Sequence, residues 1–129
     1  MAKKRSANYC RTKGNTFERK IVKELKELGF NVGTTRNNSR TEDADKVDIY
    51  DADNTLPCKI QLKATQQTPQ YFKIRSESSV KAEDFVVLWS KQEKRTTNII
   101  SVGEVVIMDK QLFYKLIKPY ANGKSTSDI

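Results

Sequence analysis

Asp48, Gln61 and Lys63 lie on two consecutive predicted strands, and their residue types could hold a metal ion beside a phosphate group. Asp48 lies in "KVDIYD", and Gln61 and Lys63 lie in the following segment "LPCKIQLKAT". Side chains alternate along a strand, so Gln61 and Lys63 share one face. If the two strands pair across the turn at residues 52–55, Asp48 comes close to both. The spacing therefore indicates one polar site built from two strands.

This set of side chains suits the hydrolysis of a phosphodiester bond. Mg²⁺ stabilises charge on phosphate and lowers the pKa of bound water, and it prefers oxygen ligands. Asp48, the Gln61 amide oxygen and a backbone carbonyl would supply ligands, and Lys63 would orient the water or neutralise the phosphate. Glu18, early in the first predicted helix, would add a carboxylate. The ordinary alternative is a hairpin whose polar residues face water, with Asp48 paired to Lys46.

The composition limits the chemistry further. The chain of 129 residues contains no histidine, which excludes a histidine general base and histidine-ligated zinc. Its 24 basic residues outnumber its 16 acidic ones, and the net charge of +8 favours a polyanionic partner such as nucleic acid. Cys10 and Cys58 have no partners at metal-ligand spacing, so we expect two reduced thiols.

A helix over residues 15–28 must position Glu18. Its apolar residues recur at helical spacing, namely Phe17, Ile21, Val22, Leu25 and Leu28. Asn15 suits the N-cap and Glu18 the matching position of a capping box. Gly29 suits the left-handed residue that follows a helix.

The remaining segments alternate between strands and polar connections. Strands are predicted over residues 30–36, 46–51, 56–65, 84–90 and 98–108, the last range holding one or two strands and the fourth being central in its sheet. Residues 37–45 and 91–97 are predicted as a loop and a turn, 71–74 as a short extended segment, and 109–120 as a final helix capped by Asp109.

These elements predict an α/β fold with a mixed central β-sheet flanked by helices. We expect a flexible basic arm over residues 1–13, a single domain over 14–120 and a flexible tail over 121–129. No apolar run approaches the roughly 20 residues that span a bilayer, and no apolar segment follows the charges of the first ten residues. A cytoplasmic protein is therefore expected, and its compact basic design would suit a phage acting in the host cytoplasm.

Four pieces of the chain, spread over residues 14–65, together resemble a known family. They are "GNTFERKIVKELKELGFNV", "TRNNS", "KVDIY" and "CKIQLKAT". They resemble the PD-(D/E)XK nuclease superfamily, and within it the archaeal-type Holliday junction resolvases. The resemblance implies a restriction-endonuclease-like fold, hydrolysis of branched DNA that depends on Mg²⁺ or Mn²⁺, and a homodimer that places two sites on the two strands of a junction.

The resemblance also implies roles for individual residues. The metal ligands would be Glu18, Asp48, Gln61 and the Leu62 carbonyl, with Lys63 completing the catalytic set. By the same resemblance Arg19, Arg36 and Ser39 would contact DNA, and we expect the basic residues Lys13 and Arg40 to join them. Gln61 departs from the family pattern, in which an acid usually stands there, although some members of the superfamily use a Gln-x-Lys variant.

Two further interpretations remain open. A degenerate site in the same fold would give a structure-specific DNA-binding protein that does not cut, and Gln61 favours this alternative. A basic RNA-binding domain would explain the charge but not the Asp-Gln-Lys spacing. Trp89, Tyr71 and Phe72 could stack on bases, although Trp89 lies in an apolar run that favours core packing.

Overall fold

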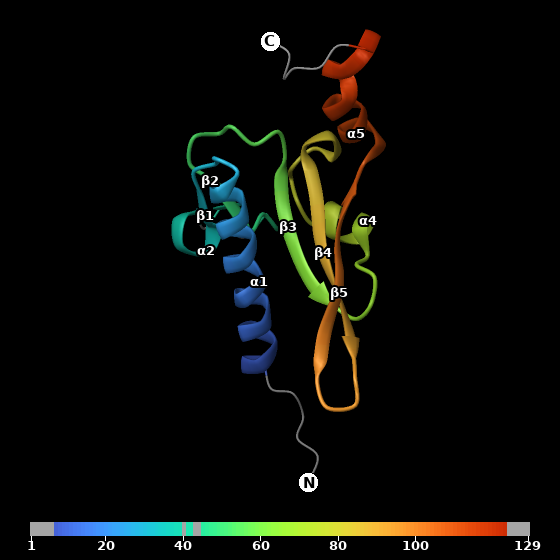
Figure 1. Ribbon diagram of the computed structural model, residues 1–129. Coiled ribbons are helices and arrows are strands. Elements are labelled where there is room, and N and C mark those ends of the chain that lie inside the picture. Colours follow the sequence, from blue (N-terminus) through green and yellow to red (C-terminus); the bar gives the residue numbers. More distant parts are fainter. Residues whose placement is uncertain (1–6, 40, 43–44, 124–129) are drawn as a thin grey trace.

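The chain folds into a mixed α/β structure (Figure 1). The computed structural model describes residues 7–39, 41–42 and 45–123, with the side chains of residues 7–14 and of Asn122 left out of the description. The elements are α1 (Ala7–Glu27), β1 (Val32–Thr34), α2 (Thr35–Asn38), β2 (Ile49–Asp51), β3 (Lys59–Thr65), α4 (Tyr71–Ser76), the 3₁₀ helix η1 (Ala82–Asp84), β4 (Phe85–Lys94), β5 (Ile99–Met108), α5 (Lys110–Ile117) and the 3₁₀ helix η2 (Lys118–Gly123). Among the described residues, every helix is too short or too polar to cross a membrane.

The strands form two sheets with different strand directions. β1 and β2 pair antiparallel, while β3, β4 and β5 form a sheet with β4 in the centre, as the sequence predicted. β3 runs parallel to β4, which places Gln61 beside Val87 and Lys63 beside Trp89. β4 runs antiparallel to β5. Because the connection between β3 and β4 contains α4, the two parallel strands are joined by a crossover rather than by a hairpin.

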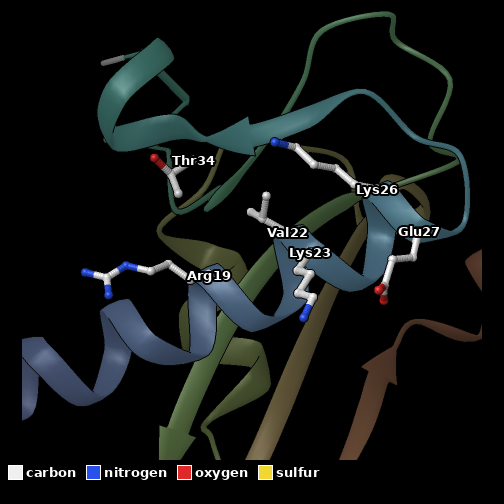
Figure 2. Close-up of a pocket in the computed structure, with 6 residues that line it drawn as sticks. All are labelled: Arg19, Val22, Lys23, Lys26, Glu27 and Thr34. Carbon is white, nitrogen blue, oxygen red and sulfur yellow. The ribbon is translucent and has the colours of Figure 1, made fainter.

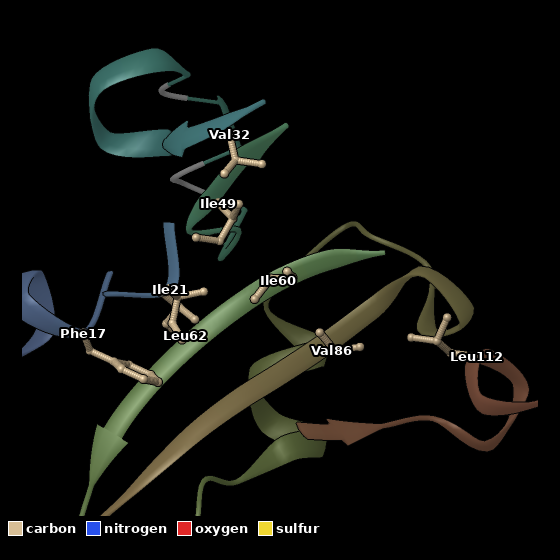
Figure 3. Close-up of a cluster of buried hydrophobic side chains, with 8 residues drawn as sticks. All are labelled: Phe17, Ile21, Val32, Ile49, Ile60, Leu62, Val86 and Leu112. Carbon is tan, nitrogen blue, oxygen red and sulfur yellow. The ribbon is translucent and has the colours of Figure 1, made fainter. Parts of the chain in front are cut away.

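Buried apolar residues cover both faces of the sheet where β4 begins, whereas most of β5 is exposed. One face forms the main core, in which α1 packs against β1 to β4 and α5 adds a side chain; its buried members are Phe17, Ile21, Val32, Ile49, Ile60, Leu62, Val86 and Leu112 (Figure 3). On the other face, Ile74 of α4 packs with Phe85 and Val87. Neighbouring residues of β4 thus point to opposite clusters.

Helix α1 begins earlier than the sequence predicted. It starts at Ala7, so the backbone of residues 7–13, which was predicted as part of an arm, is helical. The predicted cap at Asn15 and the capping box at Glu18 are also wrong, because both residues lie inside the helix. The apolar stripe defines the part of a helix that packs on the core, and it does not mark where a polar first turn begins.

The end of α1 agrees with the prediction at Gly29. This residue has a φ of 107°, and its N–H donates to the Lys26 carbonyl at 2.9 Å. The Phe30 N–H donates to the Leu25 carbonyl at 3.0 Å. These two bonds form a Schellman motif, which pairs carbonyls that the last helical turn would otherwise leave without donors.

Several other boundaries differ from the predictions. The strand at 30–36 shortens to β1, the loop at 37–45 contains the end of α2, and the extended segment at 71–74 is part of α4. β4 continues to Lys94, through half of the predicted turn at 91–97. The cap of the last helix is confirmed, since the Asp109 carboxylate accepts the Gln111 N–H at 2.8 Å. Residues 121–123 of the predicted tail belong to η2, and the rest lies outside the described residues.

Candidate active site

Asp48 lies at the junction between the two sheets. Its N–H donates to the Ile60 carbonyl at 2.8 Å, and its carboxylate oxygen Oδ2 accepts the Leu62 N–H at 2.7 Å. Its own carbonyl accepts the Thr35 N–H at 3.1 Å. Asp48 therefore joins the approach to β2, the edge of β3 and the start of α2.

The predicted pairing of the two strands is wrong, although the predicted proximity of Asp48 to β3 is confirmed. β2 forms its ladder with β1, and β3 forms its ladder with β4. Pro57 lies in the connection between β2 and β3 and has no N–H, so a regular hairpin cannot continue through it. The contact with β3 is made instead by the backbone and carboxylate of a single residue, Asp48.

Gln61 places its amide group beside the Leu62 peptide. The N–H and C=O of one strand residue point to the same side, so the Leu62 carbonyl points to the edge where Asp48 binds the Leu62 N–H. The Gln61 Nε2 atom lies 3.5 Å from that carbonyl oxygen. Gln61 is only 7% exposed, and its Oε1 atom is buried without a hydrogen-bond partner among the described residues. Asp48, Gln61 and the Leu62 carbonyl thus meet at one edge of β3.

Lys63 follows on the same face of β3 as Gln61. It is half-buried, and none of the ion pairs formed by the described residues includes it. In contrast, Lys59 on the same strand is bound to Glu42 at 3.2 Å. Lys63 is therefore a cation next to the Asp48–Gln61 group whose charge is not committed to a carboxylate of the described fold.

Glu18 is connected to this group through α2. Its carboxylate forms an ion pair with the Arg36 guanidinium at 3.1 Å. Arg36 directly follows Thr35, whose N–H binds the Asp48 carbonyl and whose hydroxyl binds the Val47 carbonyl. The short helix α2 thus contacts both predicted carboxylate ligands. Arg36, predicted as a DNA contact, holds Glu18 in the structure.

Arg19 lines a hollow between α1 and β1. The hollow has a volume of about 530 Å³, and its walls are formed by Arg19, Val22, Lys23, Lys26, Glu27 and Thr34 (Figure 2). Arg19 and Thr34 are the sequence neighbours of Glu18 and Thr35. Three cations against one carboxylate give the hollow a positive charge.

The other predicted DNA contacts are less well defined. The Ser39 hydroxyl accepts the Glu42 N–H at 3.3 Å, so it stabilises the turn after α2. The Lys13 side chain and Arg40 lie outside the described residues. Lys23 and Lys26 were missed as candidates, although their spacing from Arg19 follows the helical repeat and could have indicated a shared face.

The oxygen atoms at the edge of β3 fit a hard divalent cation. Asp48 offers a carboxylate, Leu62 a carbonyl, and Gln61 a buried amide oxygen that has no hydrogen bond among the described residues. Mg²⁺ takes such ligands and keeps several waters. Within the described parts of the chain, no three acidic, histidine or cysteine side chains gather in a metal-binding cluster. A cation here would therefore depend on the neutral Gln61 and Leu62 oxygens as well as on carboxylate.

No protein-family model, curated protein or solved structure matches this chain.

Proposed function

We propose that the protein is a metal-dependent DNA endonuclease that acts on branched DNA as a Holliday junction resolvase. The observation that carries this proposal is the meeting of Asp48, the Gln61 amide and the Leu62 carbonyl at one edge of β3, with Lys63 next along the strand. The order α1, β1, α2, β2, β3, α4 and β4, with β4 parallel to β3, is compatible with a restriction-endonuclease-like fold.

The buried Gln61 oxygen supports a bound cation. A buried acceptor without a partner costs about 1–3 kcal/mol, and a cation bound to the Gln61 oxygen would offset that cost. Asp48, Gln61 and the Leu62 carbonyl would hold Mg²⁺ or Mn²⁺, with Glu18 as a further ligand. When bound, the ion would stabilise charge on the phosphate and lower the pKa of a water molecule.

The residues of the chain would divide the remaining work. Lys63 would orient the attacking water or neutralise the charge that develops on the phosphate. The Leu62 N–H fixes the direction of the Asp48 carboxylate, and Arg36 fixes Glu18. A carboxylate can accept such a hydrogen bond and still bind a cation, because it has about four lone-pair positions.

The charged hollow would bind the DNA backbone. Arg19, Lys23 and Lys26 surround it, and the net charge of +8 favours a polyanion. Such contacts position a nucleic acid without reading its sequence. A homodimer would present two such surfaces and two sites to the two strands of a junction.

The test is cleavage of a labelled four-way junction, a flap and a linear duplex, each with Mg²⁺, Mn²⁺ or EDTA. We expect paired symmetric nicks in the junction that are lost with EDTA and with Lys63→Ala. Lys118→Ala is the matched control, because Lys118 is an exposed lysine beyond α5. Cleavage of the flap or the linear duplex alone would show that the protein is a nuclease but not a resolvase. No cleavage with either metal would reject both activities.

The second candidate is a DNA-binding protein that does not cut. Its supporting observation is that the Gln61 Nε2 atom faces the Leu62 carbonyl, so the amide partly satisfies the carbonyl that a metal ion would use. Tight junction binding without cleavage, with cleavage gained in Gln61→Glu, would favour this candidate. Cleavage by the natural sequence would exclude it.

A further inference from the structure

Trp89 lies beside Lys63 and is not part of the buried core. The parallel register of β3 and β4 makes the two residues neighbours, so their side chains stand on the same face of the sheet. The preceding residues Phe85, Val86 and Val87 are fully or nearly fully buried, whereas Trp89 is only half-buried. A large aromatic ring therefore stands next to the proposed phosphate contact.

The indole ring is held in a fixed orientation. Its Nε1 atom donates to the Thr65 carbonyl and to the Thr65 hydroxyl, each at 3.1 Å. The ring thus extends toward the C-terminal end of β3, past Lys63. These bonds fix the ring before any ligand arrives, which lowers the entropy cost of stacking on it.

Two lysines lie next to this ring. The Lys91 ammonium lies 5.9 Å from the ring centroid and is tied to the Gln66 carbonyl at 2.5 Å. Lys63 is the neighbour on β3. An aromatic ring among cations is the combination that proteins use to hold single-stranded nucleic acid, because bases stack while the backbone is neutralised.

We propose that Trp89 stacks on an unpaired nucleobase of a DNA strand whose adjacent phosphate is held at Lys63. In a continuous duplex each base is covered on both faces by its neighbours, so the ring selects DNA in which a base loses a stacking neighbour, as at an opened branch point or in a flap. This inference rests on the proposed function for the role of Lys63. It adds a residue that would determine the substrate structure.

The first test uses the natural fluorescence of the protein, because Trp89 is its single tryptophan. The full chain is titrated in EDTA with a single-stranded oligodeoxynucleotide, with a blunt duplex of the same length, and with an abasic strand that has the same backbone without bases. Quenching by the strand with bases, and little by the duplex or the abasic strand, is the expected result. Equal quenching by all three would overturn the proposal, because backbone binding alone would then explain the signal.

Substitutions provide the second test. Trp89→Leu should weaken binding to a flap by about 5- to 100-fold, the range expected for one lost stacking contact, with a much smaller change for the blunt duplex. Trp89→Phe should restore most of the flap affinity, since an aromatic ring returns. Phe113→Leu is the control, because Phe113 is an exposed aromatic on α5, which lies at the end of the sheet where β4 begins in Figure 1.

Equal affinities of Trp89→Leu and Trp89→Phe would show that only the bulk of the side chain matters and would overturn the proposal. Because these measurements need neither metal nor cleavage, they separate the two proposals. Quenching without any cleavage would retain the stacking site and reject the nuclease. Junction cleavage without base-dependent quenching would retain the nuclease and reject the stacking site.

Discussion

The Asp48 carboxylate accepts the backbone N–H of Leu62, with 2.7 Å between Oδ2 and N. This bond links a proposed metal ligand to the peptide group whose carbonyl is another proposed ligand. It also connects β3 to the chain entering β2, where no strand ladder does so. Asp48 therefore has a structural role that can be measured apart from any chemistry.

Substitutions at Asp48 should separate these two roles. Asp48→Asn keeps an oxygen that can accept the Leu62 N–H, so the free energy of unfolding should fall by no more than about 1 kcal/mol. Asp48→Ala leaves the N–H without this acceptor and should cost about 1–3 kcal/mol. Both variants should lose cleavage. Urea denaturation gives the stabilities, and equal losses in the two variants would contradict the structural role.

Substitutions at Gln61 should show whether its buried amide oxygen lowers the stability of the protein when no metal is bound. Gln61→Met replaces the buried amide by an apolar group of similar size, so we expect the free energy of unfolding in EDTA to stay within about 1 kcal/mol or to rise. Gln61→Glu buries a charge and should be less stable in EDTA. Thermal unfolding of each variant provides the measurement.

The same Gln61 variants should also differ in how much Mg²⁺ stabilises them. Mg²⁺ should raise the unfolding temperature of Gln61→Glu more than that of the natural protein, and it should not raise that of Gln61→Met. This order follows from the charge and number of oxygen ligands that each side chain supplies. Equal responses in all three proteins would place the cation elsewhere.

The hollow beside α1 should determine the salt dependence of DNA binding. Each phosphate contact adds about 0.9 to the slope of log K against log salt on duplex DNA, so Lys23→Ala and Lys26→Ala should each lower that slope by up to about 0.9. Lys118→Ala should leave it unchanged. Binding isotherms at several salt concentrations test this, and slopes equal to that of the natural protein would remove the hollow from the DNA interface.

A link between two loops should weaken in acid. The Asp45 carboxylate accepts the Ser79 hydroxyl at 2.5 Å and the Ser79 N–H at 2.6 Å. These bonds, the hydroxyl first, lower the pKa of Asp45 from its usual value of 3.8. A lowered pKa in the folded state gives stability that is present above the unfolded value and is lost as the pH falls through the folded value.

Ser79→Ala tests this link. Relative to the natural protein, it should reduce the free energy of unfolding at neutral pH, and the difference should shrink as the pH falls below 3.8. Ser76→Ala is the control, because the Ser76 hydroxyl binds the Lys73 carbonyl and no carboxylate. A difference that is independent of pH would show that the Asp45 charge plays no part.

The sequence was sufficient to predict the features that depend on local alternation. Apolar neighbours on β3 fixed Gln61 and Lys63 on one face, and the position of Gly29 indicated the end of α1. The meeting of Asp48 with β3 was predictable in outline only. The contact is made by the Asp48 carboxylate, which accepts the Leu62 N–H. A side-chain contact of this kind leaves no periodic pattern in the sequence.

The features that were missed depend on tertiary contacts. Residues 71–76 carry too few apolar positions to indicate a helix. Ile74 is buried because it packs against Phe85 and Val87. β4 extends through polar residues to Lys94 because β5 pairs with it. The partial exposure of Trp89 was missed for the same reason. An apolar run does not indicate which of its residues are packed against other elements and which are not.

Replacing Lys63 and replacing Asp48 should have different effects on stability. This difference affects which residue is lost first as mutations accumulate. Lys63 has no ion pair within the described residues, so its replacement would cost little stability. Asp48 binds both neighbouring elements. In a lineage where selection for cleavage is relaxed, we therefore expect the lysine to be replaced first, leaving descendants that keep the aspartate without the activity.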